Sequence, residues 1–257
     1  MTTTRVRYLG GPSLLLEYGR TRFLIDPTFD GAGDYPIGTR VLTKTADAVV
    51  GADELPPVDA VLLSHDQHPD NLDSAGRNYV KRAPLVLSTP AARARLGDPV
   101  RGLARWETTR VGDVTVTAVP ALHGPPGSEP LVGEVTGFVI EAAELPRVYV
   151  SGDNASLELV GDIASRYAPV DVAVLFAGAA RTALLGEANL TLGSAEAAEA
   201  AQLLQARHVV PVHFEDWAHF TQGRDTIAAA FTAAGLADRL HLLDRGDWAD
   251  FAAVPSA

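Results

Sequence analysis

The segment AVLLSHDQHPD, residues 60–70, decides how the rest of the sequence is interpreted. Its first part is a continuous apolar run, which is typical of a buried β-strand. Its second part carries three side chains that can bind a metal ion, His65, His68 and Asp70. Ligands of open α/β structures sit at the carboxyl ends of strands, so this segment predicts a buried strand that ends in a binding site.

Three further apolar strands lead into residues of the same kind. His123, Asp153 and His213 each follow such a run after at most a short turn. Imidazole and carboxylate groups are ligands that suit zinc, manganese or iron. We therefore predict a divalent metal site, most consistent with Zn2+ and with Mn2+ or Fe2+ as alternatives. Its candidate ligands are His65, His68, Asp70, His123, Asp153 and His213.

Each of these residues also has an ordinary structural explanation. A single histidine after a buried strand is more often a hydrogen-bonded structural residue than a ligand. Asp153, which precedes Asn154, fits a turn or the cap of a helix that begins near Ser156. The coincidence across four strand ends favours the metal site. His208 and His241 stand at the starts of strands instead, where we expect a structural role.

The hydrophobic pattern changes at about residue 58. Before it, short strands at residues 5–9, 13–17 and 21–25 are separated by glycine-containing turns and predict a β-meander. After it, strands alternate with helices. The predicted strands are 58–63, 84–87, 114–119, 135–141, 148–150 and 172–175, and the predicted helices are 72–82, one opening at Pro90, 194–206 and 223–234. This order predicts two sheets with helices packed outside them, in one domain over residues 1–257.

Two stretches are expected to border the site. Residues 27–57 are rich in glycine and proline and predict a long irregular loop, which in a compact domain usually forms a lid or a pocket wall. The residues directly after His213 are expected to line the pocket as well. They are Glu215, Asp216, Trp217 and His219, although a packing role fits Trp217 equally well.

Composition limits the classes of function. The 257 residues are 47% hydrophobic and 21% charged, which is typical of a globular protein. No apolar run is long enough to cross a membrane, and residues 1–10 lack the pattern of a signal peptide, so we expect a cytoplasmic protein. The net charge of −11 argues against a nucleic-acid partner and favours a small-molecule substrate. Without cysteine, any metal must be held by histidine and carboxylate.

The order of these segments resembles the metallo-β-lactamase superfamily over nearly the whole chain. The resemblance rests on FLIDP at 23–27, SHDQHPDNLD at 64–73, His123, SGD at 151–153 and PVHF at 211–214. The most similar branch is that of the predicted zinc-dependent hydrolases that include ascorbate-6-phosphate lactonase. The resemblance implies a four-layer αββα sandwich, an α/β (α+β) fold in which two mixed β-sheets face each other and helices lie outside.

Three departures from the family pattern bear on the metals. The first loop is one residue longer than usual, so either Gln67 or His68 takes the place of the second ligand. An amide is a poor zinc ligand, which favours His68. Asn71 stands where the loop's last histidine is expected, and Gly11 stands where many relatives of this branch carry a histidine. One ion is therefore better supported than two.

The resemblance implies a hydrolase that uses metal-activated water on a small ester, lactone or phosphoester. In it, Asp153 ligates and would bridge two ions, and Asp70 ligates a second ion or acts as general base. Asp66 and Asp73 would hold ligand imidazoles through their distal N–H groups, and a solvated surface position explains these two residues equally well. The alternative is a metal-free binding or scaffold protein of the same fold. A serine hydrolase ranks low, because no serine stands in a Gly-x-Ser-x-Gly elbow.

Overall fold

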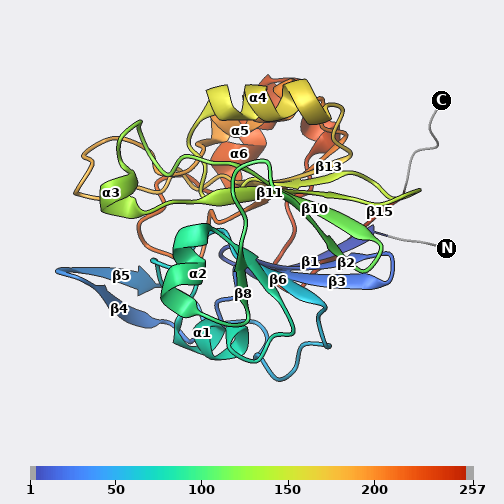
Figure 1. Cartoon of the computed structure of the whole chain (residues 1–257). Coiled ribbons are helices and arrows are strands. Elements are labelled where there is room, and N and C mark those ends of the chain that lie inside the picture. The colour runs from blue at the N-terminus through green and yellow to red at the C-terminus, as the bar shows by residue number, and fades with distance from the viewer. Residues whose placement is uncertain (1–3, 253–257) are drawn as a thin grey trace.

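Two mixed β-sheets lie face to face in the computed structural model, which describes residues 4–252 (Figure 1). The first sheet has seven strands. Its order is β15 (Trp248–Phe251), β1 (Thr4–Gly10), β2 (Ser13–Tyr18), β3 (Thr21–Ile25), β6 (Ala60–Leu62), β7 (Val86–Ser88) and β8 (Val100–Gly102). The pairs from β3 to β8 are parallel, and the pairs from β15 to β3 are antiparallel.

The second sheet has six strands. Its order is β14 (His208–Val212), β13 (Val172–Phe176), β12 (Val148–Val150), β11 (Thr136–Glu141), β10 (Val114–Pro120) and β9 (Thr108–Val111). The strands β12, β13 and β14 are parallel neighbours, whereas β9 to β12 pair antiparallel. Within the described part of the chain, a separate two-stranded hairpin consists of β4 (Gly33–Ile37) and β5 (Arg40–Lys44).

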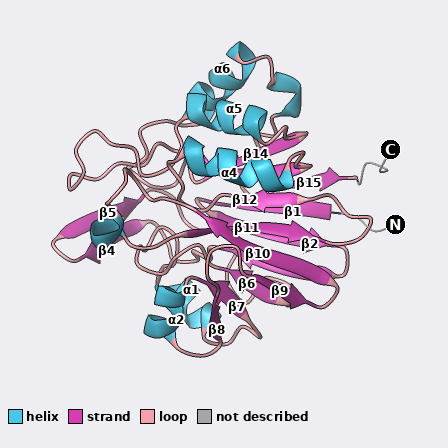
Figure 2. Ribbon diagram, turned by 45° about the horizontal axis from the view of Figure 1, so that its top comes forward, coloured by secondary structure: helices cyan, strands magenta, loops and turns pink. Residues whose placement is uncertain are grey.

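Helices cover the outer faces of both sheets, as Figures 1 and 2 show. Those over the six-stranded sheet are α4 (Leu157–Tyr167), α5 (Ser194–Leu203) and α6 (Arg224–Ala233). Those beside the seven-stranded sheet are α1 (Ser74–Val80) and α2 (Pro90–Leu96), while the short α3 (Glu129–Val132) and the 3-10 helix Ala237–Arg239 lie in connections. Pro90 opens α2 at its first turn, as predicted, and Thr89 caps it by accepting a hydrogen bond from Ala92 N.

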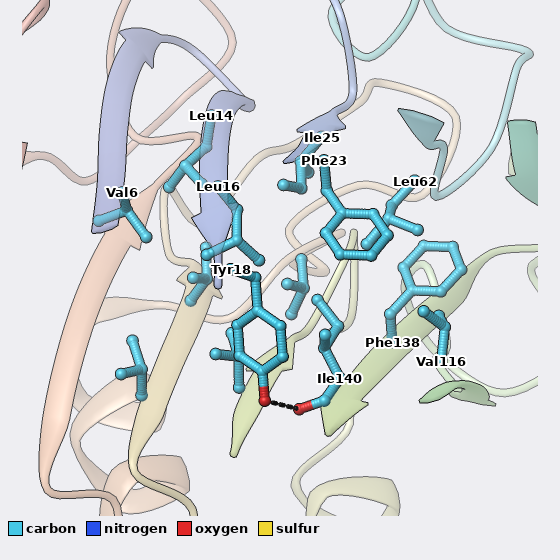
Figure 3. Packing of buried hydrophobic residues seen from close by; sticks show 14 of the residues in the cluster. Val6, Leu14, Leu16, Tyr18, Phe23, Ile25, Leu62, Val116, Phe138 and Ile140 are labelled. Carbon is cyan, nitrogen blue, oxygen red and sulfur yellow. Dashed lines mark hydrogen bonds between the residues drawn. The ribbon is translucent and has the colours of Figure 1, made fainter. Parts of the chain in front are cut away.

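The period of two along the strands divides the apolar residues between layers. Leu14 and Leu16 point into the space between the sheets, where Figure 3 shows them with residues of the opposite sheet. Leu15 belongs to the cluster on the other face of the same sheet. In the central layer the Tyr18 hydroxyl donates to Pro146 O at 2.9 Å and accepts from Ala142 N at 3.1 Å, which satisfies the one polar atom of this buried ring. The two-sheet arrangement follows from this alternation.

The predicted four-layer architecture is confirmed, and most predicted strands and helices differ from the observed ones by only a few residues at their ends. The prediction of one irregular loop over residues 27–57 is wrong for β4 and β5. Apart from buried Lys44, their residues are half-exposed or exposed and include Pro36, so the hairpin shows little alternation of apolar and polar residues. Among the described residues, no helix is both long and apolar enough to cross a membrane.

Candidate metal centre

The predicted ligands come together at one edge of the two sheets. Since β10 runs in the same direction as β12 and β14, the residues that follow these three strands meet at a common edge. The residues that follow β6 in the facing sheet close the site from the other side. Two groups form there, and within each the potential ligand atoms lie within 4.8 Å of one another. The first is His65, His68, His123 and Asp153, and the second is Asp70, Asp153 and His213.

All six side chains are buried, and the largest exposed fraction is 8%, at His68. In the first group, His65 Nε2 lies 2.9 Å and His123 Nε2 3.2 Å from His68 Nδ1. His123 Nε2 lies 3.6 Å from an oxygen of Asp153. Ligand atoms held at about 2.0–2.1 Å in a tetrahedron around zinc are separated by about 3.3 Å. The spacing of this group therefore fits one metal ion.

Hydrogen bonds outside the group determine which ring nitrogens face inward. His123 Nδ1 lies 2.9 Å from Leu190 O, a carbonyl that only accepts, so Nδ1 carries the proton and Nε2 presents a lone pair. His65 Nδ1 lies 3.0 Å from Ser64 Oγ, whose own proton goes to Asp26. His65 Nε2 therefore also presents a lone pair to the group. Two lone pairs that converge on His68 are a donor set that fits a cation.

Asp26 follows β3 and supports this arrangement from outside the group. Its carboxylate accepts hydrogen bonds from Ser64 N at 2.6 Å and from Asn71 Nδ2 at 3.1 Å. Burial raises the pKa of Asp26 to about 7, although the hydrogen bonds from Ser64 and Asn71 oppose the shift. The sequence interpretation did not give Asp26 a role. Its position in FLIDP, directly after a buried strand, is the signal that could have found it.

The second group surrounds His213. The Nε2 atom of His213 lies 3.3 Å from Asp70 Oδ2, and its Nδ1 lies 3.2 Å from Asp153 Oδ1. The backbone of His213 has a φ of +56°, and its N–H donates to Gly11 O at 2.6 Å. Asp70 Oδ1, Asp153 Oδ2 and both nitrogens of His213 are buried without a well-aligned hydrogen bond within residues 4–252. Such unsatisfied groups fit a second cation.

The electrostatics differ between the two groups. Burial, reinforced by neighbouring histidines, lowers the pKa of His65 well below its ordinary value and that of His68 to about 4. Both rings are therefore neutral at pH 7, as metal ligands must be. Burial alone would lower the pKa of His213, but the carboxylates of Asp153 and Asp70 raise it to about 10. Without a metal, a proton on His213 neutralises part of the charge of the second group.

The structure shows the surroundings of the residues at which the sequence departs from the family pattern. Gln67 packs its amide against Gly133, while His68 points into the first group. Asn71 donates to Asp153 Oδ1 at 3.2 Å, so it holds a carboxylate in place. At Gly11, a Cβ would lie 3.3 Å from Trp217 Nε1, and Trp217 therefore fills the space beside this position.

Asp66 and Asp73 do not hold ligand imidazoles as expected. Arg95 Nε lies 3.0 Å from both carboxylate oxygens of Asp66. Asp73 caps α1 by accepting from Gly76 N at 2.8 Å, and it lies 3.6 Å from Lys44 Nζ. Both carboxylates therefore serve the packing of the first sheet's outer layer.

Of the residues after His213, some lie beside the hairpin and the second group, and others face arginines. Trp217 packs against Tyr35 of the hairpin in a tilted arrangement, with ring centroids 5.5 Å apart, and His219 Nε2 lies 3.0 Å from Asp70 Oδ2. Glu215 and Asp216 instead face arginines, Arg224 and Arg245. His208 and His241 contact each other at 3.0 Å near the start of β14, whereas the site lies beyond its end.

Comparisons with known proteins identify relatives of this chain and structures that share its fold. A UPF0173 metal-dependent hydrolase of Pyrococcus furiosus is 26% identical in sequence, and the alignment covers 83% of this chain and 85% of that protein. Another, of Rubrobacter xylanophilus, is 28% identical over 95% of both chains. An isothiocyanate hydrolase from Delia radicum gut bacteria has a TM-score of 0.83 at 22% identity, over 97% of this chain and 100% of its own.

These names confirm the prediction of a metal-dependent hydrolase at the level of the family, while the lactonase resemblance stays a prediction. The model of the β-lactamase superfamily domain matches residues 21–214, a range that contains all six candidate ligands and most of both sheets. The chain therefore belongs to the β-lactamase superfamily.

Proposed function

We propose that this chain, acting as a single domain, hydrolyses a small ester, lactone or phosphoester with metal-activated water. One observation carries the proposal. The lone pairs of His65 and His123 converge on His68 Nδ1 at 2.9 and 3.2 Å, and a carboxylate of Asp153 adjoins them. A cation stabilises such a convergence of buried acceptors, because one proton on His68 Nδ1 can serve only one of the two facing nitrogens. An open His and carboxylate set without cysteine is typical of catalytic rather than structural zinc sites.

A divalent ion bound here, Zn2+ first and Mn2+ or Fe2+ as alternatives, would supply Lewis acidity and an activated water. Burial keeps the rings of His65 and His68 neutral for that purpose, because it lowers the pKa of both. Asp153 belongs to both groups and faces His123 and His213. Asp70 keeps one oxygen, Oδ1, free of hydrogen bonds within the described residues. That oxygen is the group of this chain best placed to accept the proton of an attacking water.

The surroundings favour a small substrate. The hairpin lies against the site, since Tyr35 packs against Trp217 and Arg40 donates to Thr182 Oγ1 at 2.7 Å. The positive charge of Arg40 is among the influences that lower the pKa of His68, after burial and His123, so its guanidinium lies near the first group. A hairpin in this position favours a small substrate over a bulky polymer. The overall charge of −11 also disfavours nucleic acids. Lactones and carboxylic esters rank above phosphodiesters.

The test is a panel of lactones, carboxylic esters and phosphoesters, assayed with protein loaded with zinc or manganese. His123→Ala is assayed beside the unchanged protein, because it removes one of the converging nitrogens. We expect turnover of at least one substrate class, and its loss on substitution and on chelation. Turnover that survives both changes would exclude metal catalysis. Stoichiometric metal with no turnover in the whole panel would refute the proposed substrate classes, and no bound metal would favour the binding-protein alternative.

A further inference from the structure

Two imidazoles face the same oxygen of Asp70. His219 Nε2 lies 3.0 Å and His213 Nε2 3.3 Å from Asp70 Oδ2. His219 is six residues beyond His213 and outside the segments that carry the resemblance to the family. Its side chain is 14% exposed, and its Nδ1 has no hydrogen-bond partner within residues 4–252. Among the described residues, the Nδ1 atom of this ring therefore has no hydrogen bond that would give the ring another structural role.

The backbone around His219 is held from two sides. On one side, the β5 segment pairs with the loop, since Thr45 N donates to Asp216 O at 2.7 Å and Ala218 N donates to Thr43 O at 3.0 Å. On the other side, His219 O accepts a hydrogen bond from Arg181 N at 3.1 Å. These bonds fix the position of the ring beside Asp70. A ligand held on such a support loses little conformational entropy when a metal binds.

The second group lacks one histidine compared with the family pattern. Asn71 occupies its place, and its amide is engaged by the carboxylates of Asp26 and Asp153. The group whose potential ligand atoms all lie within 4.8 Å of one another contains Asp70, Asp153 and His213, and His219 lies outside it and adjoins it through Asp70 Oδ2. The 3.0 Å between His219 Nε2 and Asp70 Oδ2 is close to the separation of about 3.3 Å expected for two ligands of one tetrahedral ion.

We propose that His219 is a ligand of a second metal ion, together with Asp70, Asp153 and His213, and replaces the histidine absent at Asn71. This inference rests on the proposed metal-dependent function. It changes the expected stoichiometry from one ion to two. It also assigns the hairpin a role in metal binding, because β5 holds the backbone of the residues just before His219.

The alternative is that His219 only positions Asp70 through a hydrogen bond. Two substitutions separate the roles. His219→Ala removes both the ligand and the hydrogen bond. His219→Gln offers an amide N–H for the hydrogen bond to Asp70, but it is a poor zinc ligand. His208→Ala is the matched control, because His208 is the first residue of β14, whereas His213 follows the last residue of that strand.

The experiment loads each purified protein with Co2+ or Zn2+, removes excess metal and measures the metal-to-protein ratio by elemental analysis. Titration with Co2+ followed by visible absorption reports the second equivalent separately. We expect about two ions per chain in the unchanged protein and in His208→Ala, and about one in both His219 variants. Circular dichroism confirms that the variants are folded. In addition, Asn71→His combined with His219→Gln should restore the second ion.

Two results would overturn the inference while leaving the proposed function intact. One is a His219→Gln protein that keeps two ions, which would make His219 a positioning residue. The other is an unchanged protein that binds one ion. If the unchanged protein binds none, the proposed function fails together with the inference.

Discussion

The Ser64 hydroxyl donates a hydrogen bond of 2.5 Å to Asp26 Oδ2, and the same Oγ lies 3.0 Å from His65 Nδ1. This relay joins residues from two strands, β3 and β6, which are parallel neighbours and end at the same edge. It determines the tautomer of His65 and turns its Nε2 toward the first group. Hydrogen bonds of this kind raise the basicity of a ligand and fix its orientation.

Ser64→Ala should therefore weaken the first metal site without removing a ligand. We expect the affinity for Zn2+ to fall by about 10–100-fold, the usual cost of losing such a partner. Competition with a chromogenic chelator measures it. Ser88→Ala is the matched control, since Ser88 is also a buried serine at the end of a neighbouring strand and its Oγ has no partner in the described chain. Equal affinities in the two variants would contradict the relay.

His65→Ala should reduce bound metal more strongly than Ser64→Ala, because it removes one of the converging nitrogens itself. We expect a loss of affinity beyond about 100-fold. Elemental analysis of protein purified without chelator gives the bound amount. His208→Ala removes a histidine that contacts His241 and should keep the metal content of the unchanged protein. Similar metal content in both histidine variants would show that the assignment of His65 is wrong.

The metal-free protein should lose stability as the pH rises above 6.5. Asp153 and Asp70 raise the pKa of buried His213 from 6.5 to about 10, so the folded chain keeps a proton that the unfolded chain has released. The stabilisation is complete below pH 6.5 and is lost as the pH approaches 10, by an amount of a few kcal/mol. Thermal unfolding of chelator-treated protein between pH 6.5 and 9.5 measures this decline.

Two comparisons test the origin of that decline. His213→Gln has no proton to lose, so its melting temperature should change less over the same range, although it is lower at pH 6.5. In the metal-loaded protein the decline should also be smaller, because the ion takes the place of the proton. A variant that follows the pH profile of the unchanged protein would assign the effect to other groups.

Asp73→Ala should destabilise the fold rather than the metal site. The substitution removes the N-cap of α1 and the carboxylate beside Lys44, whose side chain is only 4% exposed. We expect a loss of about 2–4 kcal/mol in urea unfolding, more than the cap alone contributes. Asp73→Asn preserves a capping side chain and should cost less. Unchanged Zn2+ affinity in Asp73→Asn would show that Asp73, unlike Ser64, does not support a metal ligand. A loss of affinity as large as that of Ser64→Ala would instead show that Asp73 holds a ligand imidazole, as the sequence predicts.

Much of the site could be predicted because each ligand follows an apolar run. A buried strand is visible in the sequence as a continuous hydrophobic segment, and parallel strands bring their carboxyl ends to one edge. His123 and His213, which are 90 residues apart, could be placed together on that ground alone. The choice between His68 and Gln67 was also favoured by chemistry, since an imidazole binds zinc better than an amide.

The sequence by itself determined the alternation of strands and helices and the residue types available to a metal, because hydrophobic period and side-chain chemistry are local properties. Only the tertiary structure decided how those residues are supported. Asp26 reaches His65 through Ser64, and His219 reaches Asp70 because β5 holds the loop before it. Such contacts join segments that are far apart in the chain, and their energy depends on distance and direction in three dimensions, which no local pattern of residues records.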